Sequence, residues 1–267
     1  MFRVAPARLL IATAIGCLLL ALPLHASDFD RTAFMAINDA AWRWGPPALF
    51  SCLTILGHGL SAVMLLAPTL LRAPNLLMAG LFATPVAMAL SWLPKGLIDS
   101  PRPAAVLDPA SIHVVGLRLA GHNSFPSGHT ITAFLVVGVL LAGERATRPR
   151  RPAAIAIVLV GVAVAASRIA VGAHWPSDAL AGTGLGLLAG VAGTQISLRW
   201  RIASRPVVQA LLALVVLVCA VILARIDVGY PLARPLQLVL AALGAAAAVI
   251  ALWRTWASRA PSARIPE

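Results

Sequence analysis

Long apolar stretches, separated by short polar connections, run through almost the whole chain from residue 8 to residue 253. Because a bilayer core is crossed by about 20 apolar residues in helical conformation, each such stretch predicts a membrane-spanning helix. We expect eight spans, of which the fourth is the shortest: 8–25, 47–71, 76–94, 129–143, 153–171, 178–198, 206–225 and 235–253. The pattern therefore predicts an all-α fold, a polytopic membrane helix bundle.

Composition agrees with this pattern and excludes an ordinary soluble domain. The 267 residues are 60% hydrophobic and 11% charged, and the mean hydropathy is +0.90. No long polar, Gly/Ser-rich or repetitive segment divides the chain, so we expect a single membrane domain. Cys17, Cys52 and Cys219 each lie in an apolar stretch without the paired spacing of a metal site, which favours buried thiols.

The formal charge of +12 would indicate nucleic acid as a partner for a soluble protein, but the arginines here cluster in loops between spans. Short cytoplasmic loops retain Lys and Arg, and one side of the alternating topology holds 13 of the 21 cations. That side carries Arg3, Arg8, Arg72, Arg145, Arg148, Arg150, Arg151, Arg199, Arg201, Arg205, Arg254, Arg259 and Arg264. The other side carries seven of the nine acids, leaving only Glu144 and Glu267 with the arginines. We therefore expect both termini in the cytoplasm of a bacterial cell and no nucleic-acid partner.

Residues 1–26 also resemble a secretory signal, with a basic start, an apolar core and a small residue at Ala26. We favour a retained helix, and cleavage remains the alternative. Ser27 lies outside in either case, so the predicted orientation does not depend on the choice.

Three polar segments interrupt the apolar pattern at span ends. They are KGLIDSPRP at 95–103, NSFPSGHT at 123–130, and a third that holds Ser167, Arg168 and the run His174 to Asp178. Since span three leaves the membrane where span four enters, and spans five and six do the same, all three segments must share the outer face. Polar residues at span ends are usually only solvated, and Lys95, the sole lysine, could simply reach the interface.

The third segment contains a possible catalytic pair. His174 and Asp178 are four residues apart, so they would share one helix face if the sixth span begins there. A carboxylate beside an imidazole fixes its tautomer and leaves the other nitrogen free to attack. Taken alone, such a pair is more often an ordinary hydrogen-bonded surface pair.

The second segment places Ser127, Gly128 and His129 at a helix start, where backbone amides favour an anion and Gly128 permits close approach. A plain turn with an N-cap would explain Pro126, Ser127 and Gly128 but not His129.

Together the segments read K-x6-RP, PSGH and SR-x5-H-x3-D, with 22 and 37 residues between them. This pattern closely resembles the type-2 phosphatidic acid phosphatase superfamily. Its fixed positions are Lys95, Arg102, Pro103, Pro126, Ser127, Gly128, His129, Ser167, Arg168, His174 and Asp178. The resemblance implies a six-helix phosphatase core in residues 1–198, with 199–267 as an appended transmembrane hairpin and short cytoplasmic tail.

The resemblance also implies a role for each motif residue. Those expected to bind phosphate are Lys95, Arg102, Ser127, Gly128 and Arg168. His174 would be the nucleophile that forms a phosphohistidine, Asp178 would orient it, and His129 would protonate the leaving oxygen. Three cations and backbone amides can neutralise a phosphoryl group, and no carboxylate cluster suited to Mg²⁺ is evident, so we expect no metal and no cofactor.

The expected substrate is a lipid phosphate or diphosphate hydrolysed on the periplasmic face of the bacterial inner membrane. Undecaprenyl diphosphate ranks first, followed by the phosphates of lipid A, phosphatidylglycerol phosphate and phosphatidate. A lipid-to-lipid phosphotransferase stays open, as does the oligomeric state. A haloperoxidase with the same anion cradle would be soluble, and a channel or transporter would carry charges within its spans. Residues 104–125, the longest outer connection, could form a lid or read the head group. Asp99 and Arg118 could tune the choice of head group, whereas His122 is expected in solvent.

Overall fold

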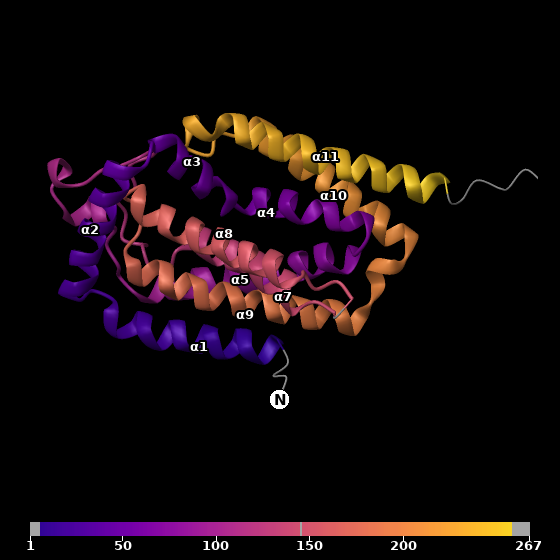
Figure 1. Cartoon of the computed structure of the whole chain (residues 1–267), viewed down its shortest axis with the longest axis horizontal. Coiled ribbons are helices and arrows are strands. Elements are labelled where there is room, and N and C mark those ends of the chain that lie inside the picture. The colour runs from indigo at the N-terminus through magenta and orange to yellow at the C-terminus, as the bar shows by residue number, and fades with distance from the viewer. Residues whose placement is uncertain (1–5, 145, 258–267) are drawn as a thin grey trace, which may run out of the picture.

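A computed structural model describes residues 6–144 and 146–257, and within these residues the chain is helical, with no strand and one isolated bridge between Ser100 and Asn123 (Figure 1). The predicted all-α fold class is therefore confirmed. The longer helices are α1 (Pro6–Leu24), α2 (Asp28–Trp44), α3 (Pro47–Leu56), α4 (Gly59–Leu66), α5 (Pro74–Leu97), α7 (Gly128–Ala142), α8 (Arg151–Ala170), α9 (Pro176–Trp200), α10 (Pro206–Arg225) and α11 (Arg234–Ala257). Short pieces complete the order: η1 (Ala67–Leu71), α6 (Pro103–Val106), η2 (Pro109–Ser111), η3 (Ile202–Ser204) and η4 (Pro231–Ala233).

Every predicted span coincides with helical residues, but the second is not one straight helix. Among the described residues, six helices are long and apolar enough to cross a membrane, the bent pair α3–α4 would add a seventh span, and α7 is a shorter apolar helix of 15 residues. The predicted span 47–71 breaks at Gly57–Gly59, and the two halves meet at 71°. A Cβ at Gly57 would lie 2.7 Å from the backbone oxygen of His129, so a glycine here lets the break lie against the start of α7.

Helix α9 is the centre of the bundle and packs closely against α7, α5 and α1. Gly182, Gly186 and Gly190, four residues apart, face the backbone of α7; a Cβ at Gly182 would lie 2.8 Å from the oxygen of Ser127. Small residues at this spacing allow the close backbone approach on which helix association in lipid depends. The α7–α9 contact therefore brings the second and third polar segments together.

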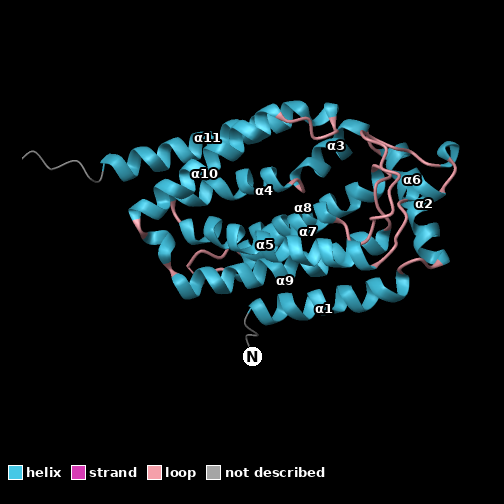
Figure 2. Cartoon of the chain, turned by 180° about the vertical axis from the view of Figure 1, so that it is seen from behind, coloured by secondary structure: helices cyan, strands magenta, loops and turns pink. Residues whose placement is uncertain are grey.

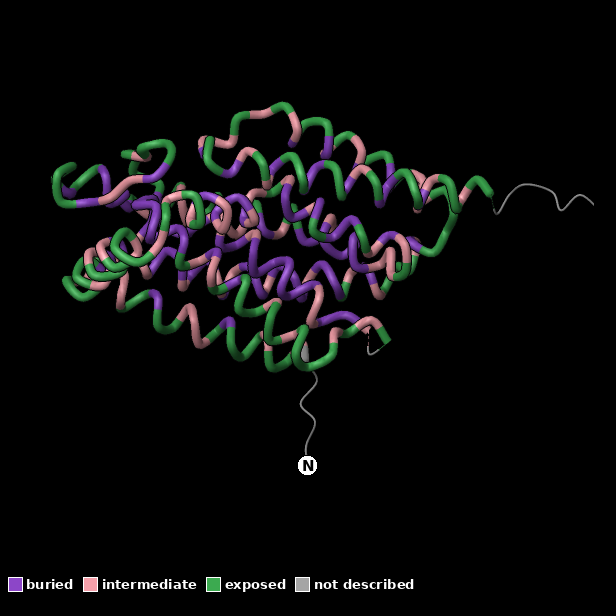
Figure 3. The backbone as a smooth tube through the Cα atoms, turned by 45° about the horizontal axis from the view of Figure 1, so that its top comes forward, coloured by how far each residue is buried: buried purple, intermediate pink, exposed green. Residues whose placement is uncertain are grey.

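The outer surface of the bundle is apolar. Figure 3 shows burial concentrated in the middle helices and exposure on the peripheral ones. Large hydrophobic side chains are exposed along α1, α10 and α11, for example Leu19 at 66%, Leu211 at 56% and Leu243 at 59%. A surface of this kind is suited to lipid, so the chain is a multi-pass membrane protein.

The two ends of the bundle differ. Helix α2, with Ser27 as its N-cap, crosses one end together with most of the loops, as Figure 2 shows. The last residues of α11 and the arginine-rich connection after α7 lie toward the opposite end, and the first residues of α1 point in the same direction (Figure 1). This separation of loops agrees with the predicted alternation; Arg3, Arg145, Arg259, Arg264 and Glu267 lie outside the described residues.

Candidate active site

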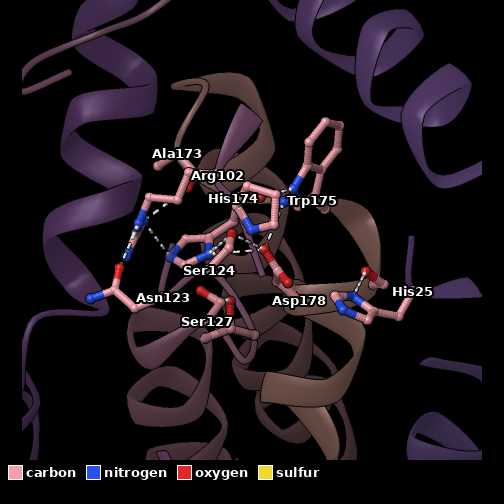
Figure 4. A network of polar contacts seen from close by, with 12 residues as sticks. His25, Arg102, Asn123, Ser124, Ser127, Ala173, His174, Trp175 and Asp178 are labelled. Atoms are coloured by element: carbon pink, nitrogen blue, oxygen red, sulfur yellow. Dashed lines mark hydrogen bonds and ion pairs between the residues drawn. The ribbon is translucent and has the colours of Figure 1, made fainter. Parts of the chain in front are cut away.

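The three polar segments meet at the α2 end of the bundle in one connected network of side chains (Figure 4). The first segment contributes Arg102, the second Asn123 and Ser124, and the third His174 and Asp178. Asn123 is exposed, whereas the other four side chains are almost entirely buried, from 0% exposed for Ser124 and Asp178 to 8% for Arg102. The fold thus brings together residues that are far apart in the sequence: Arg102 and His174, which are in hydrogen-bond contact, are separated by 72 positions.

The turn between α8 and α9 explains the spacing of Arg168 and His174. Helix α8 ends at Ala170, and the amides of Ala173 and His174 both donate to the backbone oxygen of Arg168, over 3.0 and 3.2 Å. Gly172 lies within this turn at φ +74°, where a side chain would be strained and a Cβ would lie 2.6 Å from the oxygen of His113. The turn therefore folds His174 back beside the end of α8.

His174 and Asp178 are paired, but not by the geometry expected from the sequence. Because α9 begins at Pro176, His174 precedes the helix and does not share its face. Instead, Oδ2 of Asp178 reaches back over the first turn and accepts from the amide of Trp175 over 2.9 Å and from Nδ1 of His174 over 3.1 Å. The hydroxyl of Ser124 donates to the same oxygen over 2.5 Å. Three donors thus hold the carboxylate that orients the ring.

Arg102 determines which nitrogen of His174 carries the proton. Its Nη1 lies 3.2 Å from Nε2 of His174 and 2.9 Å from the backbone oxygen of Ala173. A guanidinium can only donate, so Nε2 must be the accepting, unprotonated nitrogen, and Nδ1–H is left to donate to Asp178. Burial, together with the positive charges of Arg102, Arg168 and Lys95, lowers the pKa of His174 well below its usual range. The side chain is therefore held neutral with Nε2 directed at the cations.

Lys95 and Arg102 are both tied to Asn123. The Nζ of Lys95, near the end of α5, donates to the backbone oxygen of Asn123 over 2.6 Å, and Nε of Arg102 donates to the side-chain oxygen over 3.2 Å. The bridge between Ser100 and Asn123, with Ser124 N bonded to Ser100 O over 2.9 Å, fixes the two segments side by side. The first and second segments are thereby held as one unit.

Ser127, Gly128 and His129 lie at the start of α7, as expected. Ser127 occupies the N-cap position, but its side chain does not cap the helix and instead accepts from Thr130 over 3.0 Å. A Cβ at Gly128 would touch only Oγ of Ser91, at 3.8 Å, so packing within the protein does not require a glycine there. The ring of His129 lies 6.3 Å from the ring of His58, which stands at the break between α3 and α4.

Arg168 is the most deeply buried cation of the site. It is 1% exposed, it forms no ion pair with a carboxylate among the described residues, and its Nε has no hydrogen-bond partner there. A buried charge without a counterion is costly unless an anion neutralises it. Arg168, Arg102 and His174 lie within electrostatic range of His129. The structure therefore brings all three motif cations and both motif imidazoles to one place.

Several residues that the motif did not include complete the site. Asn123 and Ser124 belong to the same polar segment as Pro126–His129, and this neighbourhood was the sequence feature that could have indicated them. Behind Asp178, Asp30 of α2 accepts from the amide and the hydroxyl of Ser177 over 2.9 and 2.5 Å. Burial raises the pKa of Asp30, although the hydrogen bonds from Ser177 oppose that shift. No sequence pattern indicated Asp30, since nearly 150 residues separate it from its partner.

The outer connection 104–125 is anchored to the site at several points. Asn38 of α2 exchanges hydrogen bonds with His113 over 2.8 and 2.9 Å, Val115 N donates to Val171 O over 3.2 Å, and Leu117 N donates to Gly229 O over 3.2 Å. The ring of Trp175 donates to Pro101 O over 2.8 Å. Asp99 and His122 pair with each other in solvent, at 2.9 Å, and Arg118 donates to Ala104 O over 3.2 Å. The connection is therefore held against α2, the turn after α8 and the α10–α11 connection, and its expected role as a lid or head-group reader stays a prediction.

An apolar cavity of about 700 Å³ begins at Gly128 and His129 and extends between α4, α5, α7 and α10. Its walls are mainly aliphatic, and the polar side chains among them include those of His58, Thr84, Ser91, His129 and Thr132. No group of three or more His, Cys, Asp or Glu side chains suited to a metal ion occurs in the parts of the chain described. The site can thus accept an anionic group at one end and an apolar chain at the other.

Comparison with known proteins agrees with this geometry. The sequence model of the PAP2 superfamily matches residues 75–202, which contain all three polar segments. The crystal structure of Aquifex aeolicus LpxE is similar, with 26% sequence identity, a TM-score of 0.50, and an alignment over 66% of this chain and 98% of that one. No curated protein matches the sequence. The matched residues end before α10.

Proposed function

We propose that this multi-pass membrane protein is a lipid phosphatase of the PAP2 superfamily, and that it hydrolyses a lipid phosphate or diphosphate through a phosphohistidine on His174. The proposal rests on one observation, the contact between a charged part and an apolar part of the site. A buried cluster of cations and imidazoles adjoins an apolar cavity of about 700 Å³ at His129. A phosphate on an apolar chain is the kind of ligand that suits both.

In the first step, the lone pair of His174 Nε2 attacks phosphorus while the bond from phosphorus to the lipid oxygen breaks. Lys95, Arg102 and Arg168 neutralise the phosphoryl oxygens, and the amide of Gly128 and the hydroxyl of Ser127 donate to them. His129 gives its proton to the leaving oxygen. Asp178 stabilises the positive charge that develops on the His174 ring.

In the second step, water attacks phosphorus and the bond to Nε2 breaks. His129, which has lost its proton, now accepts one from that water, so inorganic phosphate is released and both imidazoles return to their starting states. Every charge that the step needs is supplied by side chains and backbone amides, and we expect the reaction to need no metal.

We further propose that the site faces the periplasm of a bacterial inner membrane, because the arginine-rich loops lie at the opposite end of the bundle. Undecaprenyl diphosphate ranks first among substrates. The phosphates of lipid A, phosphatidylglycerol phosphate and phosphatidate follow.

The decisive experiment is phosphate release by the purified full chain from a panel of these four lipids, with and without EDTA. We expect turnover of at least one lipid, no effect of EDTA, and no turnover by His174→Ala. Sensitivity to EDTA would refute the metal-free mechanism. Transfer of phosphate to an added lipid, without release to water, would favour the phosphotransferase instead.

The role of His129 has a separate test. An aryl phosphate with an acidic leaving group needs no protonation of that group. His129→Ala should therefore slow the turnover of the lipid much more than it slows the first step with 4-nitrophenyl phosphate, the release of 4-nitrophenol. Equal losses for both substrates would contradict the assignment of His129 as general acid.

A further inference from the structure

A side chain in the connection between α10 and α11, Tyr230, contacts one of the motif cations directly. It is the only tyrosine in the chain and lies outside the residues matched by the superfamily. Its hydroxyl accepts a hydrogen bond from Nη1 of Arg168 over 2.7 Å. The Cζ atom of Arg168 also lies 5.8 Å from the centre of the Tyr230 ring.

This contact is buried on both sides, since Tyr230 is 6% and Arg168 1% exposed. Nη1 has one further neighbour, the hydroxyl of Thr54, at 3.4 Å. The guanidinium is therefore held at one corner by neutral oxygens, while Nε has no partner in the described part of the chain. Arginine binds an anion best through a fork whose plane is fixed in advance, and Tyr230 fixes that plane from the side away from Nε.

Tyr230 is itself held rigidly. The preceding residue, Gly229, adopts φ +78°, and its amide donates to Asp227 over 2.8 Å. Gly116 of the outer connection lies against the ring, where a Cβ would come within 2.7 Å of Cδ1 of Tyr230. The ring packs in an apolar cluster with Ile55, Val115, Val171, Ala173 and Ala233. A side chain with this many constraints is suited to position another one.

We propose that Tyr230 is a positioning residue for Arg168, and that the α10–α11 hairpin is part of the phosphatase because it supplies this hydroxyl. The inference rests on the proposed function, since it takes Arg168 to bind the substrate phosphate. It gives the appended hairpin a specific purpose that the motif residues alone do not.

The test is Tyr230→Phe in the full chain, which removes the hydroxyl and keeps the ring. Because the lost hydrogen bond is made to a charged group, kcat/KM for the preferred lipid phosphate should fall about 10- to 100-fold, and vanadate should inhibit correspondingly less well. Thr194→Val is the matched control, because it removes a buried hydroxyl that donates within α9 to Gly190 over 2.8 Å. Its kcat/KM should stay at the wild-type level.

The same substitution in an Arg168→Lys background separates positioning from general damage. If Tyr230 acts through Arg168, Tyr230→Phe should lower kcat/KM much less in the Arg168→Lys variant than in the wild type, because the effects of coupled residues do not add. An undiminished loss in that background, or wild-type kcat/KM for Tyr230→Phe, would overturn the inference.

Failure of the proposed function would be distinguishable. A wild-type chain that released no phosphate from any lipid would refute the phosphatase assignment. Vanadate affinity, measured for the wild type and Tyr230→Phe, would then still decide whether Tyr230 positions an anion-binding Arg168: a weaker affinity of the variant would support it, and an equal one would refute it.

Discussion

Nη1 of Arg102 donates to Nε2 of His174 across 3.2 Å, so a permanent cation lies against the nitrogen that we propose attacks phosphorus. Protonation of Nε2 would remove its lone pair and set two positive charges in contact. Burial, and after it the positive charges of Arg102, Arg168 and Lys95, lower the pKa of His174 well below its usual range.

The first prediction concerns the pH profile. His174 must be neutral to act, so activity is lost as the pH falls through the lowered pKa of His174. The acid limb of kcat/KM should therefore lie below pH ~6.5, the usual pKa of histidine. Measurement of kcat/KM for one lipid phosphate from about pH 8 to about pH 4.5 would locate the limb.

Lys95→Met provides the matching control. It removes one of the cations that depress this pKa, so its acid limb should move to higher pH even though its rate is reduced. A wild-type limb above pH ~6.5, or a shift of the variant's limb to lower pH, would contradict the assignment.

The second prediction concerns Ser124, which donates to Asp178 over 2.5 Å. Ser124→Ala should lower kcat about 10- to 100-fold, because a buried hydrogen bond to a charged group contributes about 1.5–3 kcal/mol to holding that carboxylate in place. Ser197→Ala, in the same helix as Asp178, removes a buried hydroxyl that donates to Asn75 over 2.9 Å at the other end of the bundle. That variant should keep the wild-type kcat, and a similar loss in both would point to general destabilisation.

The third prediction concerns Gly128. Since a Cβ there meets only Ser91 within the protein, Gly128→Ala should fold normally but lower kcat/KM by about 10-fold or more, because the methyl group would stand where the phosphate approaches the amide. Gly16→Ala, in α1, is the folding control, since its Cβ would meet nothing within 4 Å. Gly182→Ala should instead destabilise the protein, because its Cβ would meet the oxygen of Ser127 at 2.8 Å. Thermal unfolding and turnover of all three variants would separate a loss of activity from a loss of stability. Full activity of Gly128→Ala would refute the proposed binding of phosphate by the amide of Gly128.

The sequence was sufficient to predict apolar helices along all eight expected spans and the convergence of the polar segments, although in the described residues six helices have spanning length, or seven spans if the bent pair α3–α4 is one. Apolar length determines where helices cross a membrane, and alternation of their direction then places segments such as 95–103 and 123–130 on one side. Helix α2 was not predicted, because its polar sequence, Asp28–Trp44, lacks the apolar length on which the span assignment relied. The break at Gly57–Gly59 was missed for the opposite reason: the residues on both sides of it are equally apolar.

Side-chain partners were less predictable than helices. The pairing of His174 with Asp178 was expected, but from a shared helix face, whereas the structure forms it through the first turn of α9. The contact of Tyr230 with Arg168 spans 62 residues and has no local pattern, because it depends on how the hairpin packs against α4 and η1. Such contacts follow from packing in three dimensions, which a single sequence does not show.

The fourth prediction concerns the apolar cavity, which we propose holds the hydrocarbon chain of the substrate. Thr84 of α5 lines it, and Thr84→Phe should fill part of its volume. Each methylene that is displaced into a less favourable position costs up to about 0.8 kcal/mol, so KM for a long-chain lipid phosphate should rise about 10-fold or more. Hydrolysis of phenyl phosphate, which has no chain, should be unaffected.

The control for this prediction is Ala156→Phe, which adds the same ring to a separate apolar groove on α8 that contains no motif residue. This variant should change neither KM for the long-chain lipid phosphate nor the hydrolysis of phenyl phosphate. If Thr84→Phe impaired the two substrates equally, the cavity would have no part in chain binding. A rise in KM for the long chain alone would place the chain between α4 and α5, with its phosphate at His129, where the cations can reach it.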